Sequence, residues 1–273
     1  MNCRVGLGLS KTSSVSLNES ESLNLLTPSA KHESSHASSE TKRGQVRISE
    51  TFTSRQGEGV LTGTPSFFIR TTGCNLRCWF CDTPYASWEP KGTHTSVEQL
   101  VDQAKQSGVQ HVVLTGGEPL LSRFVAPLAS RLRKEGFHLT IETAGTVDRA
   151  VEADLMSISP KFSSSAPQQD KHPDWHQRHQ ERRLPWDTLQ KLIDQSSDYQ
   201  LKFVVDSSQD YPELLEFMEK IQAVKSKVWV MPQGSTIEAL NRAEYWLKPW
   251  CTSQGFHYCE RMQIRWFGNR RGT

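Results

Sequence analysis

Short β-rich runs alternate with amphipathic helical patterns along most of the chain, and this rhythm leaves few folds open. The β-rich runs cover residues 67–70, 112–114, 139–141, 155–158, 201–205 and 228–231. Apolar residues at helical spacing lie between most of these runs, for example Val97, Leu100, Val101 and Ala104. Strand, helix, strand repeated about six times predicts an α/β fold with a parallel sheet, whose strands are joined by crossovers.

Two segments depart from this rhythm. Serine dominates residues 1–44, which lack a sustained apolar period, so we expect a disordered Ser-rich tail ahead of one domain at residues 45–273. Within that domain, residues 162–186 hold Pro167, Pro173, Pro185 and many charges, which predicts a surface insertion. A solvated loop is the simplest interpretation; docking an electron donor or covering the site is the alternative.

The composition of the chain limits the kinds of molecule that it is expected to bind. Lys plus Arg is 32 and Asp plus Glu is 30, so the net charge of +2 argues against a polybasic nucleic-acid protein. No apolar run approaches the roughly 18 residues that a membrane helix needs. Six cysteines are too few for a disulfide scaffold in a chain of 273 residues. We therefore expect a cytoplasmic protein that binds neither nucleic acid nor membrane.

Three of the cysteines, Cys74, Cys78 and Cys81, crowd into one loop after the run at 67–70. A structural zinc site uses four protein ligands, usually in two pairs, so a single zinc ion is the less favoured interpretation. Three thiolates on a four-iron cluster leave one iron without a protein ligand, and an open metal position is what a catalytic centre needs. Cys251 and Cys259 are expected to be free thiols rather than part of a second cluster.

The spacing of these cysteines after an early strand resembles the radical S-adenosylmethionine (SAM) superfamily. The resemblance implies a partial (β/α)6 TIM-like barrel with one four-iron, four-sulfur (4Fe-4S) cluster. The open iron would chelate the amino and carboxylate groups of SAM, and an electron from the cluster would cleave the sulfonium to a 5′-deoxyadenosyl radical. No protein residue is singled out as catalytic, because the radical arises at the cluster.

One polar motif precedes the first predicted strand, and the others follow strands, where parallel sheets place their chemistry. They are Ser-Arg-Gln-Gly-Glu-Gly at 54–59, Cys-Asp-Thr at 81–83, Thr-Gly-Gly-Glu-Pro at 115–119, Glu-Thr at 142–143, Ser-Pro-Lys at 159–161 and Met-Pro-Gln-Gly at 231–234. This set is similar to the 7-carboxy-7-deazaguanine synthase family over about residues 48–273. The resemblance implies a carbon–nitrogen lyase that converts 6-carboxy-5,6,7,8-tetrahydropterin to 7-carboxy-7-deazaguanine and ammonia in queuosine-type biosynthesis. It also implies Mg²⁺, an electron donor such as flavodoxin or ferredoxin, and a homodimer.

The resemblance implies roles for individual residues. Cys74, Cys78 and Cys81 would bind the cluster, and Thr83 would offer its hydroxyl to Mg²⁺. The SAM-binding set would be Phe80, Cys81, Asp82, Gly117, Glu142, Ser159, Pro160, Lys161, Met231, Pro232, Gln233 and Gly234. The substrate-binding set would be Arg55, Gln56, Gly57, Arg70, Thr115 and Thr273. Arg70 would pair with the substrate carboxylate through its guanidinium fork.

Two positions depart from the family pattern, since Arg55 stands where an apolar residue is usual and Ala144 where asparagine is common. Simpler roles also exist: Arg70 as a surface ion pair, and Glu142 as a salt-bridge partner of Lys161.

Two other functions share some features, namely an activase that installs a glycyl radical on a partner protein and a zinc-binding nucleic-acid adaptor. The activase should lack the 56–58 loop and the 159–161 motif, whereas the adaptor would bind zinc and no iron.

Overall fold

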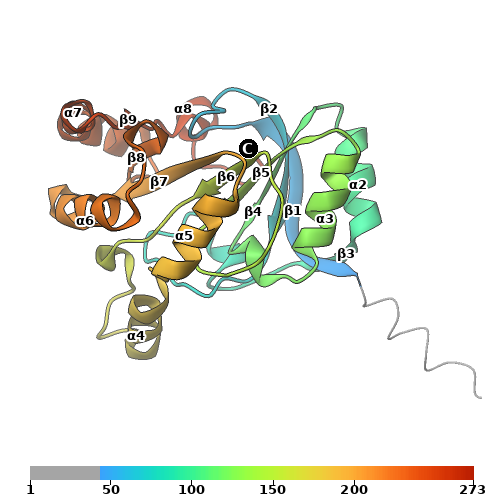
Figure 1. Ribbon diagram of the computed structural model, residues 1–273, viewed down its shortest axis with the longest axis horizontal. Coiled ribbons are helices and arrows are strands. Elements are labelled where there is room, and N and C mark those ends of the chain that lie inside the picture. The colour runs from blue at the N-terminus through green and yellow to red at the C-terminus, as the bar shows by residue number, and fades with distance from the viewer. Residues whose placement is uncertain (1–43) are drawn as a thin grey trace, which may run out of the picture.

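The computed structural model describes residues 44–273 and contains one mixed sheet of nine strands (Figure 1). The strands are β1 (Gln45–Arg55), β2 (Pro65–Thr71), β3 (Thr93–Ser96), β4 (His111–Gly116), β5 (His138–Thr143), β6 (Leu155–Ile158), β7 (Tyr199–Val205), β8 (Val228–Pro232) and β9 (His257–Tyr258). Their order is β3-β1-β2-β4-β5-β6-β7-β8-β9, so the described sheet does not close. The predicted disordered tail lies outside the described residues except for Gly44.

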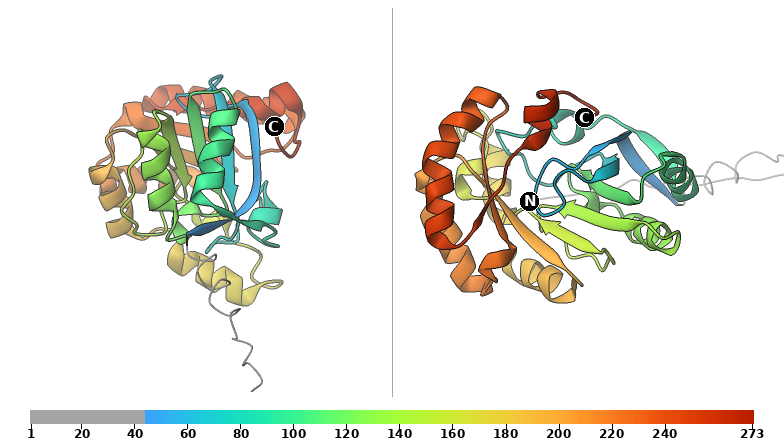
Figure 2. Two further views of the ribbon diagram at one scale, coloured as in Figure 1. Left: turned by 90° about the vertical axis from the view of Figure 1, so that its right-hand side faces the viewer. Right: turned by 90° about the horizontal axis from the view of Figure 1, so that it is seen from above.

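Seven strands, from β2 through β9 in the sheet order, are parallel, and every predicted β-rich run lies within one of them. The helices are α2 (Val97–Gln106), α3 (Val125–Lys134), α4 (Pro173–Arg182), α5 (Trp186–Gln195), α6 (Tyr211–Ile221), α7 (Ile237–Gln254) and α8 (Met262–Phe267). Seen from above, the larger helices line the outside of a curved, open sheet (Figure 2). The predicted α/β partial barrel is confirmed. The β5–β6 connection, however, is a loop without a helix.

The period of two along each strand separates the core from the barrel interior. Leu114, Ile141 and Phe203 belong to the apolar core that the helices cover. Their neighbours Thr115, Glu142 and Lys202 point to the opposite face and line a cavity. The same alternation that builds the core therefore carries polar side chains into the interior.

The edge of the sheet was not predicted. Strand β1 pairs antiparallel with β2 on one side and with β3 on the other. Helix α2 begins directly after β3, and Ser96 and Gln99 form the capping box at its start.

The expected solvated loop at 162–186 instead contains α4. Pro173 stands in the first turn of this helix, where a proline without an N–H costs no hydrogen bond. His179 of the same helix is fully buried. Among residues 44–273, none of the helices combines the length and hydropathy needed to span a bilayer.

Candidate active site

A cavity of about 520 Å³ opens at the carboxyl ends of the parallel strands. Most of the predicted site residues line it, although they come from distant parts of the chain. They are Arg55, Gln56, Gly57, Arg70, Cys74, Cys78, Phe80, Cys81, Asp82, Thr83, Thr115, Gly117, Glu142, Ser159, Lys161, Met231, Gln233 and Thr273. Three predicted SAM contacts, Pro160, Pro232 and Gly234, are buried and are not part of the wall.

The three cysteines are half-buried in the wall of this cavity. Burial raises the pKa of Cys74 to about 12 and that of Cys78 to about 11, so both are neutral thiols until a metal replaces the proton. No three Cys, His, Asp or Glu side chains among residues 44–273 converge closely enough to hold a single metal ion. The thiolates of a four-iron cluster need not meet at one point, and three soft sulfur donors beside an open cavity suit such a cluster.

The cysteine loop is seated on the end of β4 by main-chain contacts. The Glu118 N–H donates to the Gly73 carbonyl (2.9 Å), and the Gly73 N–H donates to the Ala86 carbonyl (2.7 Å). A Cβ atom at Gly117 would lie 2.2 Å from the Gly73 oxygen and 2.7 Å from the Ala86 oxygen. Gly117 is therefore required by the close approach of the cysteine loop itself, in addition to any approach of a cofactor.

Gly117→Ala is expected to destabilise the apoprotein by about 1–3 kcal/mol, because both clashing atoms are backbone and the loop must move. It should also lower the iron bound after reconstitution. Urea unfolding and iron content measure the two effects. Gly108→Ala is the control, because Gly108 has a φ of +72° and open space around it. The control should cost about 1 kcal/mol and leave the iron content unchanged; equal iron loss in both variants would contradict the seating role.

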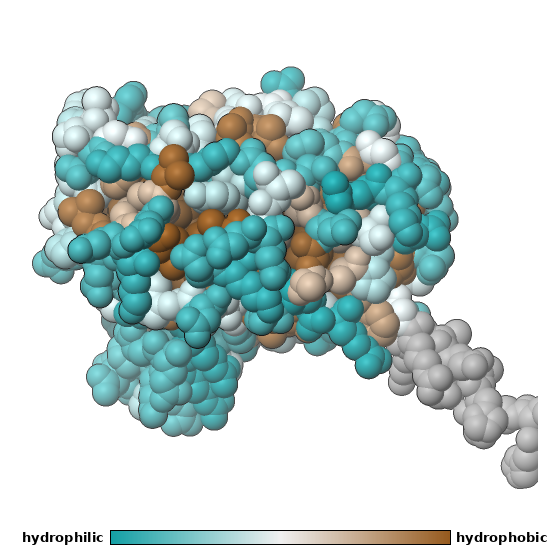
Figure 3. Space-filling view, viewed as in Figure 1, coloured by the Kyte–Doolittle hydropathy of each residue, from teal (hydrophilic) through white to brown (hydrophobic). Residues whose placement is uncertain are grey.

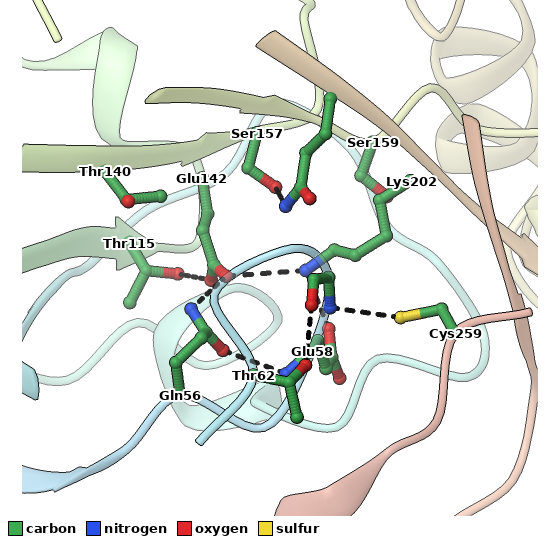
Figure 4. Close-up of polar contacts among 12 residues, drawn as sticks. Gln56, Glu58, Thr62, Thr115, Thr140, Glu142, Ser157, Ser159, Lys202 and Cys259 are labelled. Atoms are coloured by element: carbon green, nitrogen blue, oxygen red, sulfur yellow. Dashed lines mark hydrogen bonds and ion pairs between the residues drawn. The ribbon is translucent and has the colours of Figure 1, made fainter. Parts of the chain in front are cut away.

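A buried charge network crosses the interior (Figure 4). Lys202 donates to Glu58 (2.7 Å) and Glu142 (3.4 Å). Glu142 also accepts from the Thr115 hydroxyl (2.9 Å) and the Gln56 amide (3.2 Å). Although burial alone would raise it, Lys202 and Arg261 lower the pKa of Glu58 to about 2, and the two carboxylates raise the pKa of Lys202.

This network shows whether Glu142 forms the alternative salt bridge with Lys161. Its ion-pair partner is Lys202 and not Lys161, whose ammonium donates to the carbonyl and hydroxyl of Ser159. Glu142 was expected on the SAM side of the site. Its contacts place it beside Gln56 and Thr115, both of which were expected on the substrate side.

Arg70 also has a protein partner. Its Nε donates to Glu50 (2.8 Å), which additionally accepts from Tyr85 (2.9 Å) and from Arg271 (2.7 Å) near the chain end. These donors lower the pKa of Glu50 against the opposing effect of burial. Among the described residues, the terminal guanidinium nitrogens of Arg70 donate to no protein acceptor, so the fork remains available at the cavity.

Several residues that were not predicted shape the site. Arg261 joins three loops by donating to the Gly234 carbonyl (2.5 Å), Asp82 (2.5 Å) and Glu58 (3.4 Å). Glu118 is buried and accepts from Thr143 and from the Ala144 N–H, each at 2.8 Å. Glu58 and Glu118 stand inside glycine motifs that the sequence showed, and Lys202 holds an inward strand position. Arg261 has no comparable local signal, because its contacts lie far away in sequence.

Comparison with known proteins agrees with this geometry. The model of the radical SAM superfamily matches residues 68–205. A 7-carboxy-7-deazaguanine synthase from Rhodopirellula baltica is 55% identical over 226 residues, which cover 83% of this chain and 88% of that protein. One from Halobacterium salinarum is 41% identical, covering 80% and 88%. The crystal structure of QueE from Escherichia coli shares the fold, with a TM-score of 0.59, 24% identity and coverage of 83% of this chain and 98% of that one.

Proposed function

The chain belongs to the 7-carboxy-7-deazaguanine synthase family of the radical SAM superfamily, and we propose that its cavity holds the cluster, SAM and a carboxylated pterin side by side. The reaction of this lyase turns 6-carboxy-5,6,7,8-tetrahydropterin into 7-carboxy-7-deazaguanine with loss of ammonia. It consumes no net electrons. The observation that carries the proposal is the opening of three half-buried cysteines into the cavity where the polar strand ends converge.

Cys74, Cys78 and Cys81 would hold the cluster, and the residues at 80–82, 159–161 and 231–234 would surround SAM. When bound, these groups supply the radical that starts the rearrangement. The protein's task is then to orient the pterin and keep water away. Arg70, whose Nε is fixed by Glu50, would direct its free fork to the substrate carboxylate.

Glu142 would serve the substrate side. A carboxylate accepts hydrogen bonds from the ring N–H and amino groups of a pterin, and Thr115 and Gln56 hold this carboxylate in place. Lys202 pairs with this carboxylate at 3.4 Å. The main chain at 55–57 would contact the pterin edge, and Thr273 would close over it, since both line the cavity.

The test is anaerobic reconstitution followed by incubation with 6-carboxytetrahydropterin, SAM and a chemical reductant. Mass spectrometry should detect 7-carboxy-7-deazaguanine and ammonia release. Omitting the reductant is the control. A reconstituted protein that forms 5′-deoxyadenosine but no deazaguanine would contradict the substrate assignment. Bound zinc without iron would instead support the adaptor alternative.

We also propose Mg²⁺ at Thr83, which lines the cavity beside Cys81 (Sγ to Oγ1, 3.8 Å). A hard cation can take one protein oxygen when substrate and water supply the others. Thr83→Ala is expected to raise the Mg²⁺ concentration for half-maximal activity about tenfold. The dissociation constant of SAM, measured by equilibrium binding, should change less than about twofold.

The control for this prediction is Thr252→Ala, because Thr252 is exposed on α7 and its hydroxyl donates to the Lys248 carbonyl. This variant should leave both quantities unchanged. If Thr83→Ala weakens SAM binding as much as it weakens the Mg²⁺ response, Thr83 belongs to the SAM site and the magnesium assignment fails.

The partners follow from the same reaction. We propose that an external donor such as flavodoxin or ferredoxin reduces the cluster, because the cluster must be reduced before SAM is first cleaved even though the overall reaction consumes no net electrons. We also propose a cytoplasmic homodimer. Exposed apolar side chains on neighbouring helices, Leu215 of α6 with Ile237 and Tyr245 of α7, support a subunit contact. Light scattering of the purified protein tests the dimer.

A further inference from the structure

The segment that the sequence left without a role packs directly against the cysteine loop. It comprises a short turn at Ser163–Ser165 and helix α4, which stands out from one end of the molecule (Figure 1). Its outer surface is hydrophilic (Figure 3), as expected for a solvated helix. Its inner side is different, because His179 is fully buried there.

His179 connects the helix to the cysteine loop. Its Nδ1 accepts from the Arg77 N–H (3.2 Å), and its Nε2 lies 2.8 Å from the Ser165 hydroxyl oxygen. That hydroxyl donates its own proton to the Phe162 carbonyl (2.6 Å), so Nε2 must be the donor to Ser165. Both ring nitrogens are therefore committed, and the tautomer is assigned from the hydrogen-bond network.

The same segment holds the other side of Cys78. The Trp79 N–H donates to the Ser165 carbonyl (3.1 Å), and the Trp79 indole donates to the Ser164 carbonyl (3.0 Å). The main-chain N–H groups of Arg77 and Trp79, the two residues that flank Cys78, are thus both bound to the segment. The Arg77 guanidinium lies 4.0 Å from the centre of the Trp175 ring, which adds a cation–π contact.

The segment Ser163–Ser165 is itself bound to the helices of the barrel. Ser163 donates through its N–H (2.9 Å) and its hydroxyl (2.7 Å) to Glu213 of α6. Ser164 donates its hydroxyl to Asp210 (2.6 Å), and Arg183 pairs with Glu213. The residues that flank Cys78 are consequently connected, through this turn, to α6 and to the residue that precedes it.

We propose that His179 is a positioning residue, which with the turn at Ser163–Ser165 braces the main chain around Cys78 for cluster binding. This inference rests on the proposed function, because it assumes that Cys78 binds the cluster. Replacing a residue that orients a metal ligand typically lowers metal affinity by about 10–100-fold. A ligand loop whose peptide groups are fixed before the metal arrives also loses less entropy on binding.

Two near-isosteric substitutions separate the two bonds of the imidazole. The side-chain oxygen of His179→Asn occupies the place of Nδ1 and can still accept from Arg77. The amide nitrogen of His179→Gln occupies the place of Nε2 and can still donate to Ser165, but leaves the Arg77 N–H without an acceptor. His179→Leu removes both bonds. Arg182→Ala, exposed on the same helix, is the control.

The measurement is the rate at which bathophenanthroline removes iron from the reconstituted protein, with the electron paramagnetic resonance spectrum of the reduced cluster as a second readout. We expect His179→Gln and His179→Leu to lose iron about tenfold faster than wild type. His179→Asn and Arg182→Ala should stay within about twofold. If the Leu variant does not fold, the comparison of Asn with Gln still decides.

Each outcome is informative. Equal iron loss in the Asn and Gln variants would indicate a packing defect and overturn the brace, as would a Leu variant that behaves like wild type. A wild-type protein that takes up no iron would overturn the proposed function and the brace together. A wild type that holds its cluster beside a Gln variant that releases it faster supports the inference.

Discussion

Cys78→Ala should reduce 5′-deoxyadenosine formation to the assay background and leave the protein without a stable cluster. Only two of the three thiols would remain. The substituted position is also the one flanked by two bound N–H groups: Trp79 donates to Ser165 of the turn, and Arg77 donates to His179 of α4. With these thiolates as the proposed ligands of the cluster, no fourth cysteine among the described residues of this wall could replace the lost sulfur. Iron and sulfide content, together with chromatography of the SAM products, measure the effect.

The matched control is Cys251→Ala. Cys251 is 1% exposed and packs in the apolar core, so its loss removes a buried sulfur that does not line the cavity. The control should keep the cluster and the activity, and should cost about 1 kcal/mol of stability. Persistent SAM cleavage in Cys78→Ala would show that the radical does not depend on this cysteine loop.

Lys202→Met should lower the free energy of unfolding of the apoprotein by about 3–5 kcal/mol, because Glu58 and Glu142 would lose the buried cation between them. Activity should fall as well, since Glu142 would lose its ion-pair partner. Urea unfolding at pH 7 measures the stability. Lys105→Met removes a half-exposed ion pair with Glu135 and should cost less than about 1 kcal/mol.

The pH dependence offers a second check on the same network. The pKa of Glu58 is lowered from 4.5 to about 2 in the folded protein, so the unfolded chain takes up its proton first as the pH falls. The stabilisation is complete above pH 4.5 and disappears as the pH drops toward 2, and it amounts to roughly 3 kcal/mol. In Lys202→Met this decline should become shallower. An unchanged slope would show that Lys202 does not set the ionisation of Glu58.

The candidate site was predictable where its residues form short motifs at strand ends. Parallel strands bring their carboxyl ends to one edge, so motifs as distant as Thr115 and Lys161 had to approach each other. The cysteine loop was recognisable because its three ligands lie within eight consecutive positions. Pro160, Pro232 and Gly234 belong to the same motifs but do not line the cavity, because a motif does not show which of its residues face the interior.

The partners of the charged groups could not be predicted in the same way. Lys202 lies 144 residues from Glu58 and 60 from Glu142. Arg261 lies 179 residues from Asp82. Which carboxylate meets which cation depends on how the strands curve, and the sequence holds many equivalent charges. The burial of His179 could not be predicted for the same reason, because it depends on where α4 packs.

The alternation of strand and helix patterns was therefore sufficient for the fold class, and the short motifs at the strand ends carried the resemblance to the family and the general location of the chemistry. Periodic patterns and short motifs are both encoded within a few neighbouring residues. Only the tertiary structure decided that Glu142 pairs with Lys202, that Gly117 lies against the cysteine loop, and that His179 of α4 accepts from the Arg77 N–H. Such contacts depend on the three-dimensional approach of segments that are remote along the chain, and no local pattern specifies that approach.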